Sequence, residues 1–179
     1  MLEVIDNFVP LNIVEDLQKT MLTGSFPWYF LEDITGNGIQ KRPAMMHYFR
    51  TTDNYQSDYI SILDPITNLF RFSFGNDYKM AQARSFLQFP LGYKEDSPDS
   101  PHIDFNYKHL VLLYYVKDSD GDTILYDNTS ITENSSLTEM LRVTPSAGKA
   151  IIFDGEHYHT AMQPVNNTRC VINFNFYKD

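Results

Sequence analysis

Cysteine is almost absent from this chain of 179 residues, and the only one, Cys170, has no partner for an internal disulfide. Nothing in the cysteine usage therefore indicates an oxidising compartment. Long apolar runs are also missing, and none approaches the roughly 20 residues that a membrane-spanning helix needs. The N-terminal residues lack the basic and apolar regions of a signal peptide. These absences predict a cytoplasmic protein with no membrane segment.

Basic residues are scarce, because 14 Lys and Arg stand against 23 Asp and Glu and give a net charge of -9. Proteins that bind a phosphate backbone need Lys and Arg, so the composition argues against nucleic acid as a partner. The sequence has no internal repeat and no low-complexity linker. Its length suits one domain. We expect a single domain over residues 1–179, with a helical lead-in of about 1–75 and a β core of about 80–177.

Two segments of the N-terminal part have apolar residues at helical spacing. The first is Pro10–Leu22, where the proline is acceptable in the first turn. The second runs from near Ser57 to Phe70, and Pro65 inside it predicts a break or a restart of the helix. The sequence Gly-Asn-Gly at 36–38 predicts a turn, in a hairpin.

Beyond about Met80 the pattern changes to short strands separated by turns. The last of them alternates with a period of two and is rich in Val, Ile and aromatic residues, which suit a sheet. Several short strands after a helical part predict a closed or two-sheet β structure that helices buttress. The expected strands are Ala81–Phe89, His109–Lys117, Thr123–Tyr126, Lys149–Phe153 and Arg169–Tyr177.

His102 and Asp104 stand two residues apart, and alternate side chains of an extended segment share a face. Both side chains can therefore bind one metal ion, and a distant second histidine completes a triangle of two histidines and one carboxylate. That triangle suits non-haem Fe(II), since it leaves three coordination positions for reactants. A histidine and an aspartate at this spacing also occur by chance in polar loops. Their place between a polar, proline-containing loop and an apolar strand favours a catalytic site.

Two histidines, His157 and His159, compete for the third position, and both follow an apolar segment. In an extended chain they share a face, so spacing does not separate them. Each is equally compatible with a solvated histidine in a loop. The residue types alone leave the choice open.

Arg169 follows His159 by ten residues and offers a planar cation that can clamp a carboxylate. The alternatives are an exposed arginine at the end of a strand, and Lys149 as the anchor. Of Tyr114 and Tyr115 only one can face a pocket, because neighbours in a strand point in opposite directions. A metal triangle with open positions and an anion clamp indicates an oxygenase with a dicarboxylate cosubstrate.

Several segments add to this set in a fixed order and spacing. They are Pro-His-Ile-Asp (101–104), Leu-Leu-Tyr-Tyr-Val (112–116), Asp-Gly-Asp-Thr-Ile-Leu-Tyr (120–126), Thr-Pro-Ser-Ala-Gly-Lys-Ala-Ile-Ile-Phe-Asp (144–154) and Tyr-His-Thr-Ala-Met-Gln-Pro-Val (158–165), closed by Arg169. In this order they resemble the 2-oxoglutarate/Fe(II)-dependent oxygenases, in particular the prolyl-hydroxylase-like branch. The resemblance covers most of the chain and is strongest from Arg84 to Phe176.

The resemblance implies a mainly β fold with flanking helices. Its core would be a double-stranded β-helix, or jelly roll, with N-terminal α-helices packed on one sheet. It assigns His102, Asp104 and His159 as metal ligands, in preference to His157. It assigns Arg169 to the distal carboxylate of the cosubstrate. No catalytic residue beyond the metal ligands is expected.

Three further positions follow from the same resemblance. Tyr115 matches a tyrosine that assists the arginine, and Thr123 matches a residue that lines the cosubstrate pocket. Phe89 stands where some prolyl hydroxylases have a tyrosine that binds the cosubstrate, so we expect that contact to be lost. The polar loop Gly92–Pro101, which leads into the ligands, is expected to cover the site as a lid.

The implied activity is that of an Fe(II)- and 2-oxoglutarate-dependent dioxygenase. It would use O2 to hydroxylate a substrate, release succinate and CO2, and use ascorbate as a reductant. A prolyl residue, another protein side chain and a small molecule all stay open as the substrate. One alternative is a cupin-type metal enzyme that does not use 2-oxoglutarate, which leaves Arg169 without a task. The other is a non-catalytic jelly-roll binding module, against which the intact ligand set argues.

Overall fold

The computed structural model describes residues 1–35, 41–92, 98–130 and 136–179. The turn expected at 36–38 lies outside these residues. The helical elements are α1 (Leu11–Met21), the 3-10 helix η1 (Ile60–Leu63) and α2 (Asp64–Phe74). The strands are β1 (Leu2–Ile5), β2 (Tyr29–Leu31), β3 (Ala44–Arg50), β4 (Lys79–Gln88), β5 (Leu110–Tyr115), β6 (Thr123–Tyr126), β7 (Glu139–Val143), β8 (Ala150–Asp154), β9 (His159–Ala161) and β10 (Arg169–Tyr177).

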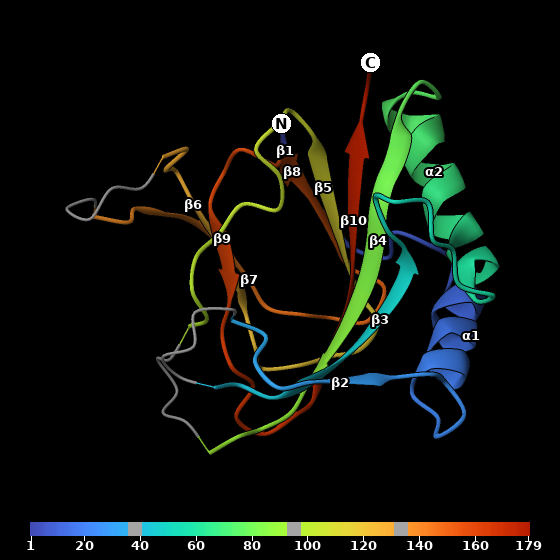
Figure 1. Cartoon of the computed structure of the whole chain (residues 1–179), viewed down its shortest axis with the longest axis vertical. Helices are drawn as coiled ribbons and strands as arrows, with labels where there is room; N and C mark the ends of the chain where they lie inside the picture. The colour runs from blue at the N-terminus through green and yellow to red at the C-terminus, as the bar shows by residue number, and fades with distance from the viewer. Residues whose placement is uncertain (36–40, 93–97, 131–135) are drawn as a thin grey trace.

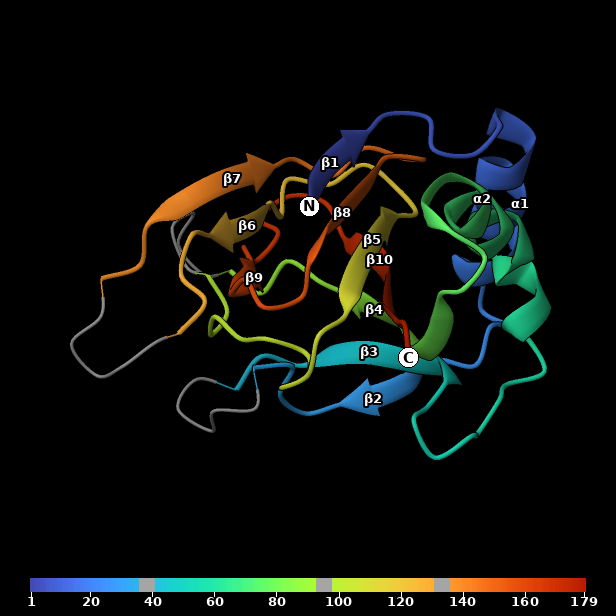
Figure 2. The same cartoon turned by 90° about the horizontal axis from the view of Figure 1, so that it is seen from above.

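The strands form two antiparallel sheets. The larger sheet has the order β1-β8-β5-β10-β4-β3-β2, and the smaller sheet has the order β7-β6-β9. In Figure 1 the helices α1 and α2 lie along one side of the larger sheet, and the smaller sheet lies on the other side. Figure 2 shows the same three layers from above. The expectation of a mainly β, two-sheet structure with few helices is confirmed.

Alternation along β5 and β10 separates two hydrophobic cores. Even-numbered residues of both strands, such as Leu112 and Phe174, pack in the core that also contains residues of α1 and α2. The ring of Phe70 in α2 stacks on Phe176 of β10, with 4.0 Å between the ring centroids. Odd-numbered residues enter the core shared by the two sheets: Val111, Leu113, Tyr115 and Val171, with Leu125 of β6 and Val143 of β7. The odd-numbered side of the larger sheet therefore faces the space between the sheets.

Pro65 marks a restart of the helix, as the sequence predicts. The 3-10 helix η1 ends at Leu63, and α2 begins at Asp64 with the proline in its first turn. A proline lacks the N–H that a helix interior needs, but the first turn does not use that N–H. Among the described residues, none of the helices has both the length and the apolar character required to span a lipid bilayer.

The part of the chain expected to be a helical lead-in also contains three strands, which corrects that expectation. β1, β2 and β3 all join the larger sheet. β1 is mostly exposed and β2 has only three residues, so neither has a recognisable apolar pattern. Each forms because a longer strand offers it a ladder, β8 for β1 and β3 for β2. Short edge strands of this kind depend on their tertiary context more than on local propensity.

Candidate active site

A cavity of about 360 Å³ lies between the two sheets. Its apolar wall comes from odd-numbered residues of β5 and β10, together with side chains of β4 and β8. Its polar wall contains the candidate metal ligands His102, Asp104 and His159. The same wall contains Arg169, the candidate anion clamp, at another place. The strands β4, β5, β8 and β10 contribute Phe86, Val111, Leu113, Phe153 and Val171 to the apolar wall.

His102 and His159 face each other across an isolated pair of backbone hydrogen bonds. Each residue's N–H donates to the other's carbonyl oxygen, and both N···O distances are 3.0 Å. Residues paired in this way project their side chains to the same side. The two imidazole rings accordingly lie 4.6 Å apart between centroids. The pairing brings together two histidines that are 57 positions apart in the chain.

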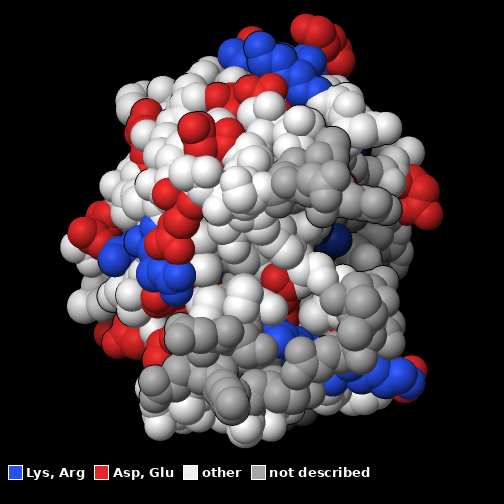
Figure 3. All heavy atoms as spheres, turned by 90° about the vertical axis from the view of Figure 1, so that its left-hand side faces the viewer, with Lys and Arg blue, Asp and Glu red and all other residues white. Residues whose placement is uncertain are grey.

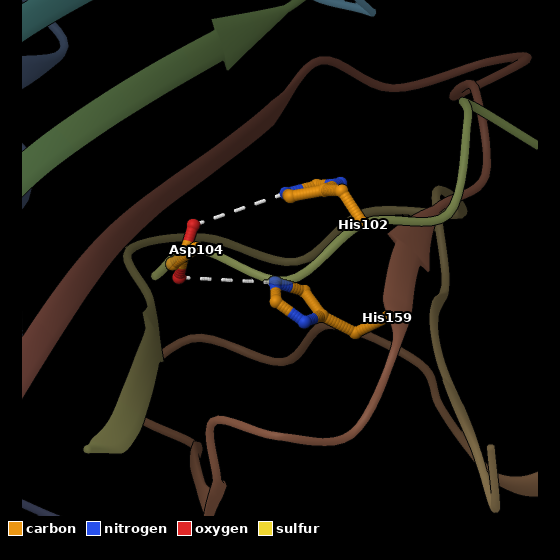
Figure 4. Close-up of side chains that lie close together, drawn as sticks. All are labelled: His102, Asp104 and His159. Atoms are coloured by element: carbon orange, nitrogen blue, oxygen red, sulfur yellow. Dashed lines mark ion pairs between the residues drawn. The ribbon is translucent and has the colours of Figure 1, made fainter. Parts of the chain in front are cut away.

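Asp104 points between the two rings (Figure 4). Its oxygens lie 3.9 Å from Nε2 of His102 and 3.9 Å from Nε2 of His159. One ligand atom from each residue can be chosen so that all three lie within 4.8 Å of one another. Within the described parts of the chain this is the only such group of His, Cys, Asp or Glu side chains. The carboxylate is fully buried, whereas the His102 side chain is 52% exposed.

The protonation states favour a cation at this place. Burial raises the pKa of the Asp104 carboxyl, but His159, Arg84 and His102 more than offset burial and hold that pKa well below its usual range. Burial lowers the pKa of His159 to about 4. At neutral pH the site therefore offers an ionised carboxylate and a neutral imidazole. These are the forms that bind a metal ion.

The hydrogen bonds of the two imidazoles also leave them ready to bind a metal ion. Nδ1 of His102 lies 3.2 Å from the carbonyl oxygen of Ser100, and Nδ1 of His159 lies 3.4 Å from that of His157. A carbonyl can only accept, so each Nδ1 carries the proton and each Nε2 has a free lone pair. A metal-binding histidine is usually oriented by a contact of this kind. The residues present thus fit a divalent metal ion.

His157 lies apart from this group. Its Nδ1 is 3.2 Å from the carbonyl oxygen of Tyr126, on the strand β6. His157 and His159 would share a face in an extended segment, but the chain turns at Gly155 and Glu156 and is not extended before β9. The turn directs only His159 toward Asp104.

Asp104 is held from three sides. The guanidinium of Arg84 on β4 donates to Oδ1, and the Nδ2 atoms of Asn173 and Asn175 on β10 donate to Oδ2 at 3.0 and 2.8 Å. These donors fix the carboxylate, which belongs to a segment without regular secondary structure. A ligand held in this way needs little reorganisation when a metal ion binds.

Arg169 begins β10 and is buried in the cavity. Its Nε donates to the carbonyl oxygen of Gly121 at 2.9 Å, and its two terminal nitrogens donate to Gln88 Oε1 and Thr123 Oγ1, both at 2.8 Å. Arginine has five N–H groups, so one on each terminal nitrogen has no acceptor among the described residues. A carboxylate can accept both in parallel. Lys149, the alternative anchor, instead lies 3.4 Å from Asp6 and does not line the cavity.

Tyr115 and Thr123 form one unit with Arg169. The Tyr115 hydroxyl donates to Thr123 Oγ1 at 2.8 Å, and the same oxygen accepts from Arg169. Because Thr123 Oγ1 accepts two bonds, its own proton is available for a third partner. Thr123 lines the cavity and Tyr115 stands behind it. Tyr114 points into the other core, on the side of the helices.

Phe89 does not occupy the position that the resemblance gives it, which is a correction. It follows the end of β4, is 37% exposed and does not line the cavity. The β4 residues that face the cavity are Arg84, Phe86 and Gln88. The reason is the register, since Gln88 pairs directly with Arg169. Residues paired across two strands share a face, and the next residue along the chain points away.

Asp99 anchors the described end of the loop that leads into His102 and Asp104. Its carboxylate accepts from Arg42 at 2.6 Å, from Gln163 at 2.8 Å and from Gln88 at 3.1 Å. Its carbonyl oxygen accepts from the hydroxyl of Thr160 at 2.6 Å. Residues 93–97 of the expected lid lie outside the described residues. The remainder, 98–101, is tied to β9 and β4 by these bonds.

The sequence reasoning missed five polar residues of the site. The sequence did indicate Asn173 and Asn175, because they stand four and six positions after Arg169 in β10 and so face the same side of the sheet. The other three depend on pairings between distant segments, which no local pattern reveals. The missed residues are Arg84, Gln88, Asp99, Asn173 and Asn175.

No protein-family model and no curated protein matches this sequence. Solved structures do match. An oxidoreductase of the 2OG-Fe(II) oxygenase family from Burkholderia pseudomallei is 12% identical, with 99% of this chain and 85% of that chain covered and a TM-score of 0.69. A prolyl hydroxylase from Trichoplax adhaerens, in complex with a peptide fragment of the oxygen degradation domain of hypoxia inducible factor, is 15% identical. The match covers 99% of this chain and 83% of the prolyl hydroxylase chain, with a TM-score of 0.69.

A third match is the epimerase SnoN in complex with Fe3+, alpha ketoglutarate and nogalamycin RO. It is 14% identical, with 99% of this chain and 78% of that chain covered and a TM-score of 0.66. Identities this low show a shared fold. The chain thus has the jelly-roll fold of 2-oxoglutarate/Fe(II) oxygenases, prolyl hydroxylases among them, over nearly its whole length. The resemblance inferred from the sequence motifs is confirmed at that level.

Proposed function

We propose that this protein is an Fe(II)- and 2-oxoglutarate-dependent dioxygenase that hydroxylates its substrate. The observation that carries the proposal is the presence of two complementary groups in one cavity. One is the cluster of His102, Asp104 and His159, and the other is the buried guanidinium of Arg169 with two uncommitted N–H groups. A buried cation without an anion is costly, so a carboxylate ligand accounts for its position. The shared fold supports the same reading.

His102, Asp104 and His159 would hold the Fe(II). When bound, Fe(II) supplies the redox chemistry that couples the breakdown of 2-oxoglutarate to succinate and CO2 with hydroxylation of the substrate by O2, and ascorbate would serve as a reductant. The protein contributes the orientation of the ligands. Asn173 and Asn175 fix the Asp104 carboxylate, and the Nδ1 hydrogen bonds fix the two rings.

Arg169 and Thr123 would bind the distal carboxylate of 2-oxoglutarate. The arginine offers two parallel N–H donors, and the threonine offers a hydroxyl proton. Tyr115 would act through Thr123, which it holds in place by its hydrogen bond. The apolar wall of the cavity would pack against the methylene carbons of the cosubstrate and exclude water from them. All of residues 1–179 would form one domain around this site.

The test is the conversion of 2-oxoglutarate to succinate by the purified protein with Fe(II), ascorbate and air. We expect succinate to form slowly even without an added substrate, and the Asp104→Ala variant to form none. Anaerobic calorimetry on the Fe(II)-loaded protein tests the binding of 2-oxoglutarate independently of turnover. A protein that binds Fe(II) but not 2-oxoglutarate would overturn the proposal and would favour the cupin-type alternative.

A further inference from the structure

Arg84 is a second arginine in the cavity, and the proposed reaction gives it no task beyond its hydrogen bond to the Asp104 carboxylate. It lies on β4, faces the same side as Gln88 and pairs across the sheet with Asn173. Its guanidinium donates from one terminal nitrogen to Asp104, and its side chain is 20% exposed. Arg84 is therefore a cation beside the proposed metal position and accessible from the cavity.

The charges that line the cavity leave Arg84 without a lasting counter-ion. The described lining residues carry four charged side chains, two arginines and two aspartates. Asp99 is paired with the buried Arg42 at 2.6 Å. Arg169 would be paired with the distal carboxylate of 2-oxoglutarate. Asp104 and the proximal carboxylate of 2-oxoglutarate would together balance the two positive charges of the metal ion. The positive charge of Arg84 would then have no anion to balance it.

The binding of a metal ion increases this imbalance. In the metal-free protein Asp104 serves Arg84 as an anion, but a metal ligand shares its negative charge with the ion. Two cationic groups on one carboxylate repel each other, and in a cavity of low dielectric the repulsion is poorly screened. An unbalanced charge is costly in such surroundings unless an anion accompanies it.

Arg84 also has hydrogen-bonding capacity to spare. Arginine carries five N–H groups, and among the described residues a single one of them has an acceptor, Asp104. The Nε atom has no hydrogen-bond partner among the described residues. The other terminal nitrogen belongs to a side chain that is partly accessible. The guanidinium can thus keep its bond to Asp104 and donate to a second anion through its other terminal nitrogen.

We propose that the primary substrate of this protein is a carboxylate, and that Arg84 binds its anionic group beside the metal centre. The inference rests on the proposed function, because that function supplies the charges that Arg84 has to balance. The carboxylate belongs to a free carboxylic acid or to the C terminus of a peptide, which present the same chemistry. A prolyl ring in the middle of a peptide, which is neutral, leaves Arg84 uncompensated.

The charge of the protein surface is consistent with recognition of an anion by Arg84 alone. The whole chain has a net charge of -9, so the surface as a whole does not attract anions. Figure 3 views the molecule from the side of the smaller sheet and shows acidic groups scattered over that face, with basic groups near its centre as well. An anionic substrate would need a specific cation in the cavity, since the surface field would not hold it.

The probes are matched pairs that differ only in charge. One set consists of N-acetyl amino acids with a free carboxylate and the corresponding primary amides. The other set consists of tripeptides with a free or an amidated C terminus. Binding is measured by calorimetry on protein loaded with Fe(II) and saturated with 2-oxoglutarate under argon. Saturation keeps the carboxylate probes away from Arg169, and the two sets distinguish a small acid from a peptide terminus.

Three variants test the part that Arg84 plays. Arg84→Gln removes the charge, Arg84→Lys keeps it, and Arg71→Gln makes the same change on α2, at the far side of the larger sheet. Before the probes are added, affinities for Fe(II) and 2-oxoglutarate are measured for each variant. We expect a carboxylate probe to bind at least tenfold more tightly than its amide. Arg84→Gln should abolish this preference, Arg84→Lys should keep part of it, and Arg71→Gln should keep all of it.

A second readout is the salt dependence of binding. The affinity of the wild-type protein for the carboxylate probe should fall as ionic strength rises, and that of Arg84→Gln should not. Equal binding of acids and amides, failure of every carboxylate probe to bind, or an unchanged preference in Arg84→Gln would each overturn the proposal. Failure of the wild-type protein to bind 2-oxoglutarate is a different result, because it overturns the proposed function itself.

Discussion

Arg169 donates a hydrogen bond to the side-chain oxygen of Gln88 at 2.8 Å, and the amide nitrogen of Gln88 donates in turn to Asp99 at 3.1 Å. Gln88 thus links the proposed cosubstrate arginine to the segment that leads into His102. Asp99 is also bonded to Arg42, so the link extends to the chain before β3. The part of the cavity around Arg169 and the loop beside His102 thus form one network of buried polar groups.

Gln88→Leu should weaken the binding of 2-oxoglutarate, because Arg169 loses a partner that orients its guanidinium. The bond is donated by a charged guanidinium and is worth about 1.5–3 kcal/mol. Because it acts on 2-oxoglutarate only through Arg169, we expect a part of this value, a loss of affinity of roughly 2- to 12-fold. Affinity for Fe(II) should not change. Anaerobic titrations of the two ligands measure both values, with Gln56→Leu at an exposed position as the control. Equal losses for Fe(II) and 2-oxoglutarate would instead indicate general damage to the fold.

Arg169→Ala should reduce the affinity for 2-oxoglutarate more strongly than Gln88→Leu. It removes two charge-assisted hydrogen bonds, each worth about 1.5–3 kcal/mol, and every 1.4 kcal/mol corresponds to about tenfold in affinity. Arg169→Lys should keep part of the binding, since its charge remains while the planar fork is lost. Titration of the Fe(II)-loaded variants without oxygen measures this. An unchanged affinity in Arg169→Ala would remove the main argument for this cosubstrate.

Asp104→Ala and His159→Ala should each abolish tight binding of Fe(II). The aspartate is the only anion in the group of three, and the histidine is one of the two imidazoles. His157→Ala is the matched control, because this ring contacts the carbonyl oxygen of Tyr126 and lies outside the group. Metal content after dialysis against Fe(II) and the circular dichroism of the metal-free variants are the measurements. Loss of metal in His157→Ala with retention in His159→Ala would reverse the assignment.

Gly155→Ala should destabilise the protein through a clash with His109. A Cβ atom at position 155 would lie 2.0 Å from Nε2 of His109, closer than any real contact. His109 is buried, so its ring has little room to move. We expect the midpoint of urea unfolding to fall by an amount equivalent to about 1–3 kcal/mol, as for an overpacked core. With Gly155 present, His109→Ala should lower the stability. In the Gly155→Ala protein the same substitution should raise the stability by more than that amount, because it removes the clash.

Stability should depend on pH through His47. Burial lowers the pKa of this histidine below its ordinary value, and the hydrogen bond to the carbonyl oxygen of Pro27 offsets part of the effect. The unfolded chain therefore takes up a proton at a higher pH than the folded protein. The stabilising contribution is fully present above the unfolded value of about 6.5 and declines as the pH falls below it.

The measurement is urea unfolding of the metal-free protein at several pH values between about 8 and 5. His47→Gln should flatten the decline in the free energy of unfolding below about pH 6.5, because glutamine does not titrate in this range. An identical slope in the variant and the wild-type protein would contradict the prediction.

Local patterns in the sequence determined a large part of the fold and the types of residue in the site. The period of two in β10 places Arg169 on the opposite side from Cys170, and the same alternation separates Tyr115 from Tyr114. The restart of a helix at Pro65 follows from the missing N–H of proline. These features depend on neighbours within a few residues, so one stretch of sequence contains all the information that they need.

Only the tertiary structure decided which residues meet in the cavity. The turn after β8 separates His157 from His159, and the backbone pairing of His102 with His159 brings two distant segments to Asp104. The register of β4 against β10 selects Gln88 over Phe89. Register and pairing result from the packing of the whole sheet. A shift of one residue exchanges the buried and exposed faces of a strand, so the local sequence cannot fix these contacts by itself.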